Sequence, residues 1–270
     1  MQRVLIGAVA RAMDPGCPMD WLPVLVGGQG VGKTAFVSNL APNDFFVEMT
    51  APLEKLISEP YRMHRGWVVE FGEIDKYFAP RYSSDFKLLI STRVDQVRRN
   101  YEEPTSMKRR FVILGTTNKS QFLVDATGNR RFIPIEVGDA HVVPIDELKK
   151  HRDNIWAAAM DAYNAGQTWL FAKEEVGQLQ EHIMRFNNDD PWQDTIKEHL
   201  CNRRIKQVEN IRELLTSALG ISVENQSRKE SNRAIDVMQS LGWSRRKTNV
   251  GSAKDGSRRT VRLWEPPEDG

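Results

Sequence analysis

The most informative stretch of the chain is Gly27-Gly28-Gln29-Gly30-Val31-Gly32-Lys33-Thr34. It matches the pattern GxxxxGK(S/T), in which glycines let successive backbone N–H groups face the oxygens of a phosphate. The apolar run at 21–26 predicts a buried strand, and 31–40 predicts a helix whose N-terminus favours an anion. In this context the pattern predicts a phosphate-binding loop. We expect Lys33 to hold the β- and γ-phosphates of a nucleotide and the Thr34 hydroxyl to ligate Mg²⁺.

Four more short apolar runs follow the loop, and they predict the other strands of one sheet. They lie at 45–47, 67–71, 111–115 and 132–137. The runs are almost continuously apolar, which is typical of parallel strands covered by helices on both faces. Helical segments are predicted between them and over 2–13. This alternation of strand and helix predicts a doubly wound α/β domain with a parallel sheet.

Two carboxylates close the strand predicted at 67–71. The chain continues as Glu70-Phe71-Gly72-Glu73, and an enzyme that hydrolyses a bound nucleotide needs acidic groups for the metal and for the attacking water. We assign Glu70 and Glu73 to these tasks, with Glu70 joining Thr34 at the Mg²⁺. The sequence leaves open which of the two polarises the water. Asp75 is a weaker third candidate, and for each acid the alternative is an ordinary residue at a strand end.

Polar and basic residues continue the candidate site. In Gly115-Thr116-Thr117-Asn118, the Asn118 amide is placed to orient a water beside the terminal phosphate, although Asn is also a common turn residue. In Thr127-Gly128-Asn129-Arg130-Arg131-Phe132, the arginines Arg130 and Arg131 could stabilise charge on the transferring phosphoryl group, in their own subunit or in a neighbour. The alternative is that they form surface salt bridges.

In this order the motifs resemble those of the virulence-associated protein E family of phage and mobile-element proteins. That family is similar to superfamily-three helicases within the AAA+ group of P-loop ATPases. The resemblance begins at Arg11-Ala12-Met13-Asp14-Pro15-Gly16-Cys17 and ends with the arginine motif. It implies a DNA-dependent ATPase that uses ATP and Mg²⁺, forms a ring, which we expect to be a hexamer, and acts in replication in the cytoplasm of a bacterial host.

The resemblance also bears on partners and on DNA contacts. Members often carry a primase-like region, and because this chain opens almost directly on the ATPase domain, we expect priming to be absent or to lie on another chain. A DNA-contacting hairpin is implied over 91–110, where basic residues surround Tyr101, a combination that suits a single strand. The residues expected to contact DNA there are Arg98, Arg99, Arg109 and Arg110. A solvated loop is the alternative for any one of them.

A second, smaller domain is predicted after Asn187-Asn188-Asp189-Asp190-Pro191, which interrupts the helical pattern. We expect an ATPase domain at 1–190 that includes a helical extension at 146–186, a linker at 191–205, and a further domain at 206–270. Helical spacing followed by two strand-like runs predicts a winged-helix-like α+β fold for the last part. It holds Arg245 and Arg246, which we expect to contact DNA. A protein-contact module is the alternative.

Composition narrows the remaining function classes. Of the 270 residues, 40% are hydrophobic and 27% charged, which is typical of a globular protein. Two cysteines exclude a disulfide-rich scaffold and cannot build a zinc site by themselves. The apolar run at 4–10 is too short to cross a bilayer, so we expect an intracellular protein without a membrane partner.

The leading hypothesis is an ATP-dependent DNA helicase with ATP sites between subunits. The alternative is an AAA+ DNA-binding ATPase that loads or remodels a replication partner without unwinding DNA itself. A P-loop kinase for small metabolites is disfavoured by the Thr-Thr-Asn strand end, the paired arginines and the basic C-terminal part.

Overall fold

The structure is a computed structural model that forms two compact units, Met1–Asn188 and Asp189–Gly270. It describes residues 1–98, 103, 105–123, 129–138, 142–187, 190–202, 205, 207–208, 210–250 and 259–266. The linker expected at 191–205 is wrong, because helix α7 (Trp192–Asn202) lies within it and belongs to the second unit. Ile196 and Leu200 of this helix are buried in that unit's core, so the segment is held by packing.

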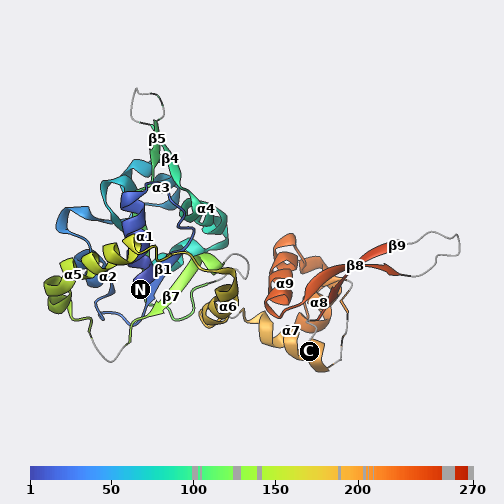
Figure 1. The fold of residues 1–270 in the computed structure, drawn as a ribbon. Coiled ribbons are helices and arrows are strands. Elements are labelled where there is room, and N and C mark those ends of the chain that lie inside the picture. Colours follow the sequence, from blue (N-terminus) through green and yellow to red (C-terminus); the bar gives the residue numbers. More distant parts are fainter. Residues whose placement is uncertain are drawn as a thin grey trace. The chain divides into compact units, whose positions relative to one another are not determined.

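The first unit is built on a five-stranded parallel sheet, as predicted (Figure 1). Its strands are β1 (Leu22–Val26), β2 (Phe46–Glu48), β3 (Val68–Phe71), β6 (Val112–Thr117) and β7 (Phe132–Glu136). The flanking helices are α1 (Gln2–Met13), α2 (Lys33–Leu40), α3 (Leu53–Ser58), α4 (Pro80–Ser91), α5 (Ile145–Asn164) and α6 (Val176–Met184). Strands β1, β3 and β6 are buried along their whole length, which explains their continuous apolar sequence.

Short 3₁₀ helices connect several of these elements. They are η1 (Asn43–Phe45), η2 (Pro60–Arg65), η3 (Ile74–Phe78), η4 (Asn129–Arg131) and η5 (Lys173–Glu175), with η6 (Val223–Asn225) in the second unit. Among the residues that the structure describes, no helix is long and apolar enough to cross a membrane.

The strand order β2-β3-β6-β1-β7 places β6 between the strand of the glycine-rich loop and the acidic strand. Val26 at the end of β1 pairs with Thr117, and Phe71 at the end of β3 pairs with Gly115. Because all of these strands are parallel, their carboxyl ends meet at one edge of the sheet. Gly115 is needed there, because a Cβ at this position would collide with the side chain of Ile74.

A two-stranded antiparallel hairpin of β4 (Val94–Val97) and β5 (Thr105–Lys108) projects from the first unit (Figure 1). It lies within the segment 91–110, in which the family resemblance implies a DNA-contacting hairpin. Arg99 and Tyr101 lie outside the described residues.

The second unit consists of α7, α8 (Ile211–Leu219), α9 (Arg228–Ser240) and the antiparallel hairpin of β8 (Ser244–Val250) and β9 (Arg259–Glu265). Asn210 caps α8, and Ser227 with Glu230 forms a capping box at the start of α9. Val208 pairs with Trp264 at the outer side of β9. Three helices and a hairpin thus share one small core of Ile196, Leu214, Val237, Met238, Trp243 and Trp264.

Candidate functional site

A cleft of about 570 Å³ lies at the edge where the carboxyl ends of β1, β3 and β6 meet. The glycine-rich loop and the first turn of α2 form one side of the cleft, and the ends of β2, β3 and β6 form the other. It is lined by Gln29, Gly30, Gly32, Lys33, Thr34, Ala35, Glu48, Met49, Thr50, Gly72, Glu73, Lys76, Thr116, Thr117 and Asn118.

The loop has the backbone that its glycines predict. Gly30 and Gly32 have φ values of 83° and 92°, in the left-handed region where glycine carries no steric penalty. At Gly27 a Cβ would lie 2.6 Å from the carbonyl oxygen of Val137, so a side chain does not fit. Helix α2 begins directly after Gly32, which places its unpaired N–H groups at the cleft.

Lys33 and Asn118 meet at the base of this loop. The Lys33 ammonium, on a residue only 7% exposed, donates to the carbonyl oxygens of Gly27 at 2.8 Å and Gly28 at 2.6 Å. It also donates to Oδ1 of Asn118 at 2.8 Å. Strand β6 therefore brings the predicted Asn118 into direct contact with the predicted Lys33, although 85 positions separate them in the chain.

Glu70 lies at the centre of the site and is fully buried. Its Oε1 accepts hydrogen bonds from the hydroxyls of Thr34 at 2.8 Å and Thr116 at 2.9 Å. Its Oε2 is also buried and has no hydrogen-bond partner among the described residues. Burial raises the pKa of Glu70, the two hydroxyls oppose this effect, and the nearby charge of Glu48 adds to it. The structure thus joins Glu70 to Thr34, the pair assigned to the metal.

Glu73 differs from Glu70 in both exposure and backbone. Its side chain is exposed at the cleft, and its φ of 49° is the only positive value outside glycine among the described residues. Such a conformation costs free energy and is found where the surrounding structure enforces it. Asp75, the weaker candidate, accepts a hydrogen bond from Thr117 at 3.0 Å and pairs with Lys119 at 2.6 Å. Asp75 is therefore engaged in structural contacts.

Two residues of the cleft were missed from the sequence, Glu48 and Thr116. Glu48 ends β2 and pairs in register with Glu70, so both carboxylates come from the same level of the sheet. The sequence did contain a signal for Glu48, which follows the apolar run at 45–47. Glu70 was selected because it follows apolar residues in the same way. Thr116 stands in the quoted Gly115-Thr116-Thr117-Asn118 motif, but only the packing of β6 beside β3 shows that its hydroxyl bonds Glu70.

Arg130 and Arg131 lie at the opposite edge of the sheet. They belong to η4, which leads into β7, and the first residue of β7, Phe132, pairs with Leu22 at the start of β1. Arg130 is exposed, whereas Arg131 is partly buried and its Nε donates to Ser91 Oγ of α4 at 3.0 Å. Within the chain, these arginines and the cleft therefore lie at opposite edges of the sheet.

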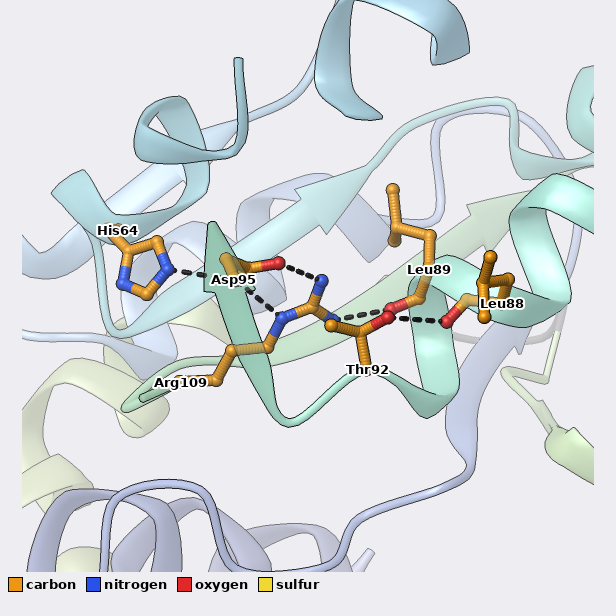
Figure 2. A network of polar contacts seen from close by, with 6 residues as sticks. All are labelled: His64, Leu88, Leu89, Thr92, Asp95 and Arg109. Atoms are coloured by element: carbon orange, nitrogen blue, oxygen red, sulfur yellow. Dashed lines mark hydrogen bonds and ion pairs between the residues drawn. The ribbon is translucent and has the colours of Figure 1, made fainter. Parts of the chain in front are cut away.

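The expected DNA contact of Arg109 is wrong, because this residue is only 3% exposed. Figure 2 shows its guanidinium between Asp95 of β4 and the end of α4. Nε and Nη2 each donate to a carboxylate oxygen of Asp95 at 2.7 Å, and Nη1 donates to the carbonyl of Leu89. His64 lies 2.9 Å from the same carboxylate. Burial raises the pKa of Asp95, but the bonds from His64 and Arg109 outweigh it and hold that pKa low. Arg109 therefore anchors the hairpin.

The other basic candidates that the structure describes face solvent. Arg98 and Arg110 are exposed at the two strands of the β4–β5 hairpin. In the second unit, Arg245 and Arg246 are exposed on β8, and Arg246 also lies 3.6 Å from Glu265.

The buried carboxylate yields a prediction about pH. Since burial raises the folded-state pKa of Glu70, its ionised form opposes folding once the pH exceeds the ordinary glutamate value of about 4.3. Substituting Glu70→Gln removes this charge, so the melting temperature of the variant relative to the wild type should increase as the pH is raised from 4 towards neutrality.

The measurement is thermal unfolding of both proteins across this pH range, with Glu73→Gln as the matched control at an exposed position of the same cleft. The control shows the effect of the same substitution where the side chain is exposed. A constant difference for Glu70→Gln would contradict the effect of burial on Glu70.

Comparison with known proteins identifies the family of the first unit. A family model described as the virulence-associated protein E-like domain matches residues 1–188. No curated protein matches the chain in sequence. Among solved structures, the A form of the apo NrS-1 C-terminal region aligns with a TM-score of 0.50 at 9% identity, covering 98% of this chain and 71% of that one.

Two further structures of the same region of NrS-1 each have 12% identity and TM-scores of 0.48 and 0.47. At this level of identity the likeness concerns the fold alone. The family model covers more than half of the chain, and the resemblance seen in the sequence motifs is confirmed. The chain belongs to the virulence-associated protein E-like family.

Proposed function

We propose that this protein is an ATP-hydrolysing P-loop enzyme of the AAA+ group that works as a DNA helicase in the replication of a phage or mobile element. One observation carries the proposal: Lys33, Thr34 and Asn118 line one cleft at the carboxyl edge of a parallel sheet, and the buried Glu70 accepts a hydrogen bond from Thr34 directly behind it. The position of β6 between β1 and β3 supports it, because this order brings the polar ends of both strands to the loop.

The residues fit Mg²⁺ and a nucleoside triphosphate. Thr34 supplies a hydroxyl and Glu70 a carboxylate whose Oε2 has no hydrogen-bond partner among the described residues, and hard oxygen ligands are those that Mg²⁺ prefers. Bound Mg²⁺ would neutralise charge that develops on the phosphates. The loop N–H groups and the N-terminus of α2 bind the phosphate oxygens. Lys33 shifts its bonds from the Gly27 and Gly28 carbonyls to the phosphates.

Glu70 and Glu73 differ in exposure, and this difference suits them to different roles. Glu70 is buried behind Thr34, which suits holding the metal side of the site. Glu73 is exposed at the cleft, which suits accepting a proton from the attacking water, and Asn118 orients that water. Glu48 adds negative charge at the same edge and thereby keeps the Glu70 carboxyl basic.

We propose a ring of identical subunits, a hexamer, and the position of the arginines supports a head-to-tail contact between neighbours. Because η4 lies at the edge opposite the cleft, a head-to-tail contact brings Arg130 or Arg131 of one subunit to the nucleotide of the next. The bond between Arg131 and Ser91 holds Arg131 in place, so we assign the main charge-stabilising role to Arg131.

DNA is the proposed partner of two separate surfaces. Arg98 and Arg110, with Arg99 outside the described residues, flank the β4–β5 hairpin and suit the phosphates of a single strand. In the second unit, three helices and the β8–β9 hairpin with Arg245 and Arg246 suit a winged helix on duplex DNA. The family's association with mobile elements supports a replication partner such as a primase and a place in the host cytoplasm.

Unwinding of a forked duplex tests the helicase proposal. The wild type should displace the labelled strand only with ATP and Mg²⁺, and Lys33→Ala should reduce the rate at least about 100-fold because phosphate binding is lost. Lys55→Ala, an exposed lysine on α3, serves as the control and should retain the wild-type rate. ATP turnover without strand displacement by the wild type would contradict the helicase and favour the loader or remodeller.

Subunit mixing tests the shared active site. Arg131→Ala should reduce ATP hydrolysis by roughly 10³-fold, as removal of an arginine finger does. When Lys33→Ala and Arg131→Ala proteins are mixed in equal amounts, about one quarter of the interfaces combine an intact Lys33 with an intact Arg131. Turnover should therefore return to about a quarter of the wild-type value, measured as phosphate release. Mixtures as inactive as either parent would contradict catalysis across the interface.

A further inference from the structure

A second, much smaller cavity lies in the first unit, away from the nucleotide cleft. Its volume is about 20 Å³, which is room for one particle the size of a water molecule. Phe111 and Val112 place it at the start of β6, whereas the cleft lies at the end of that strand. The cavity is lined by Arg11, Met19, Trp21, Ile90, Arg109, Phe111, Val112 and Ile113.

Two of these residues carry buried N–H groups without partners. Arg11, in the last turn of α1, is 2% exposed, and its Nε and Nη1 have no hydrogen-bond partner within the described part of the chain. Trp21 is 7% exposed, and the same holds for its Nε1. A buried donor without an acceptor costs free energy comparable to a lost hydrogen bond. The lining therefore offers donors, and it holds no carboxylate, amide or hydroxyl side chain among the described residues.

Of the two arginines at the cavity, Arg109 has a carboxylate partner among the described residues and Arg11 has none. The charge of Arg109 is compensated by its ion pair with Asp95, which is also in contact with His64. Asp20 attracts Arg11 but is paired with Arg93 at 3.1 Å on the surface, where both side chains are about half exposed. Cys17 is buried, and burial raises the pKa of its thiol, so it is uncharged at neutral pH. An arginine remains protonated in proteins, and among the described residues that line the cavity none carries a negative charge to compensate Arg11.

We propose that this cavity is a binding site for a single small anion of the chloride type, held by Arg11 and Trp21. A monatomic anion accepts from several N–H donors at once and brings no hydrogen of its own that needs an acceptor. Its charge compensates Arg11, and its size suits the cavity, whereas a phosphate or a carboxylate is too large.

The site gives a function to the Arg11-Ala12-Met13-Asp14-Pro15-Gly16-Cys17 motif, which the nucleotide cleft does not use. The lining joins the end of α1, the residue before β1, the start of β6 and Arg109 at the hairpin base. Gly16 of the same motif donates its N–H to the carbonyl of Arg109 at 2.9 Å. A bound anion therefore stabilises the first unit at the place where the β4–β5 hairpin is anchored. This inference does not depend on ATP hydrolysis.

Thermal unfolding of the full chain in potassium chloride, with potassium gluconate keeping the ionic strength constant, tests the proposal. Chloride should raise the melting temperature of the first unit in a saturable way, by about 4–8 °C at a concentration 30-fold above the dissociation constant. Arg11→Met should abolish this response. The control Arg3→Met, on the same helix but in a surface ion pair with Glu175, should retain it. Equal responses of the wild type and Arg11→Met would overturn the site.

A direct measurement covers the case in which Arg11→Met does not fold. The ³⁵Cl NMR line of a chloride solution broadens when chloride exchanges with a protein site. The wild type should broaden this line, and added bromide should reverse the broadening because it displaces chloride from the site. A line no broader than that given by an equal concentration of unfolded protein would overturn the proposal.

Discussion

The structure depends on one constraint, the insertion of β6 between β1 and β3. Because of this order, Thr116 donates to the carboxylate of Glu70 on one neighbouring strand, and Asn118 accepts from Lys33 beside the other. Gly115 makes the insertion possible, since any side chain there would collide with Ile74. The glycine-rich loop, the acidic strand and the polar strand end thus form one hydrogen-bonded site.

Much of the fold and the centre of the site could be predicted from the sequence. Strands buried on both faces have continuously apolar sequences, so the runs at 21–26, 67–71 and 111–115 located β1, β3 and β6 to within a few residues. Since the carboxyl ends of parallel strands meet at one edge, the residues at or beyond these ends, among them Lys33, Glu70 and Asn118, could be expected to converge. The motif order also predicted the family.

The errors have physical causes that the sequence does not display. Arg109 stands among basic residues, so it seemed a surface contact, but its partner Asp95 lies 14 positions away and both turn inward when the hairpin folds. Asp190-Pro191 suggested a linker, whereas Ile196 and Leu200 pack α7 into a core formed by distant residues. Glu48 was missed because β2 is short, and only its pairing with β3 places it beside Glu70. In each case tertiary contacts decided the outcome.

The rate of ATP hydrolysis with and without single-stranded DNA, for the wild type and for Lys33→Ala, tests directly whether the cleft is the ATP site of a DNA motor. If the cleft is the ATP site of a DNA motor, the wild type hydrolyses ATP faster when DNA is added, and Lys33→Ala hydrolyses none. Turnover that persists in Lys33→Ala, or a wild type that neither binds nor hydrolyses ATP, would contradict the account.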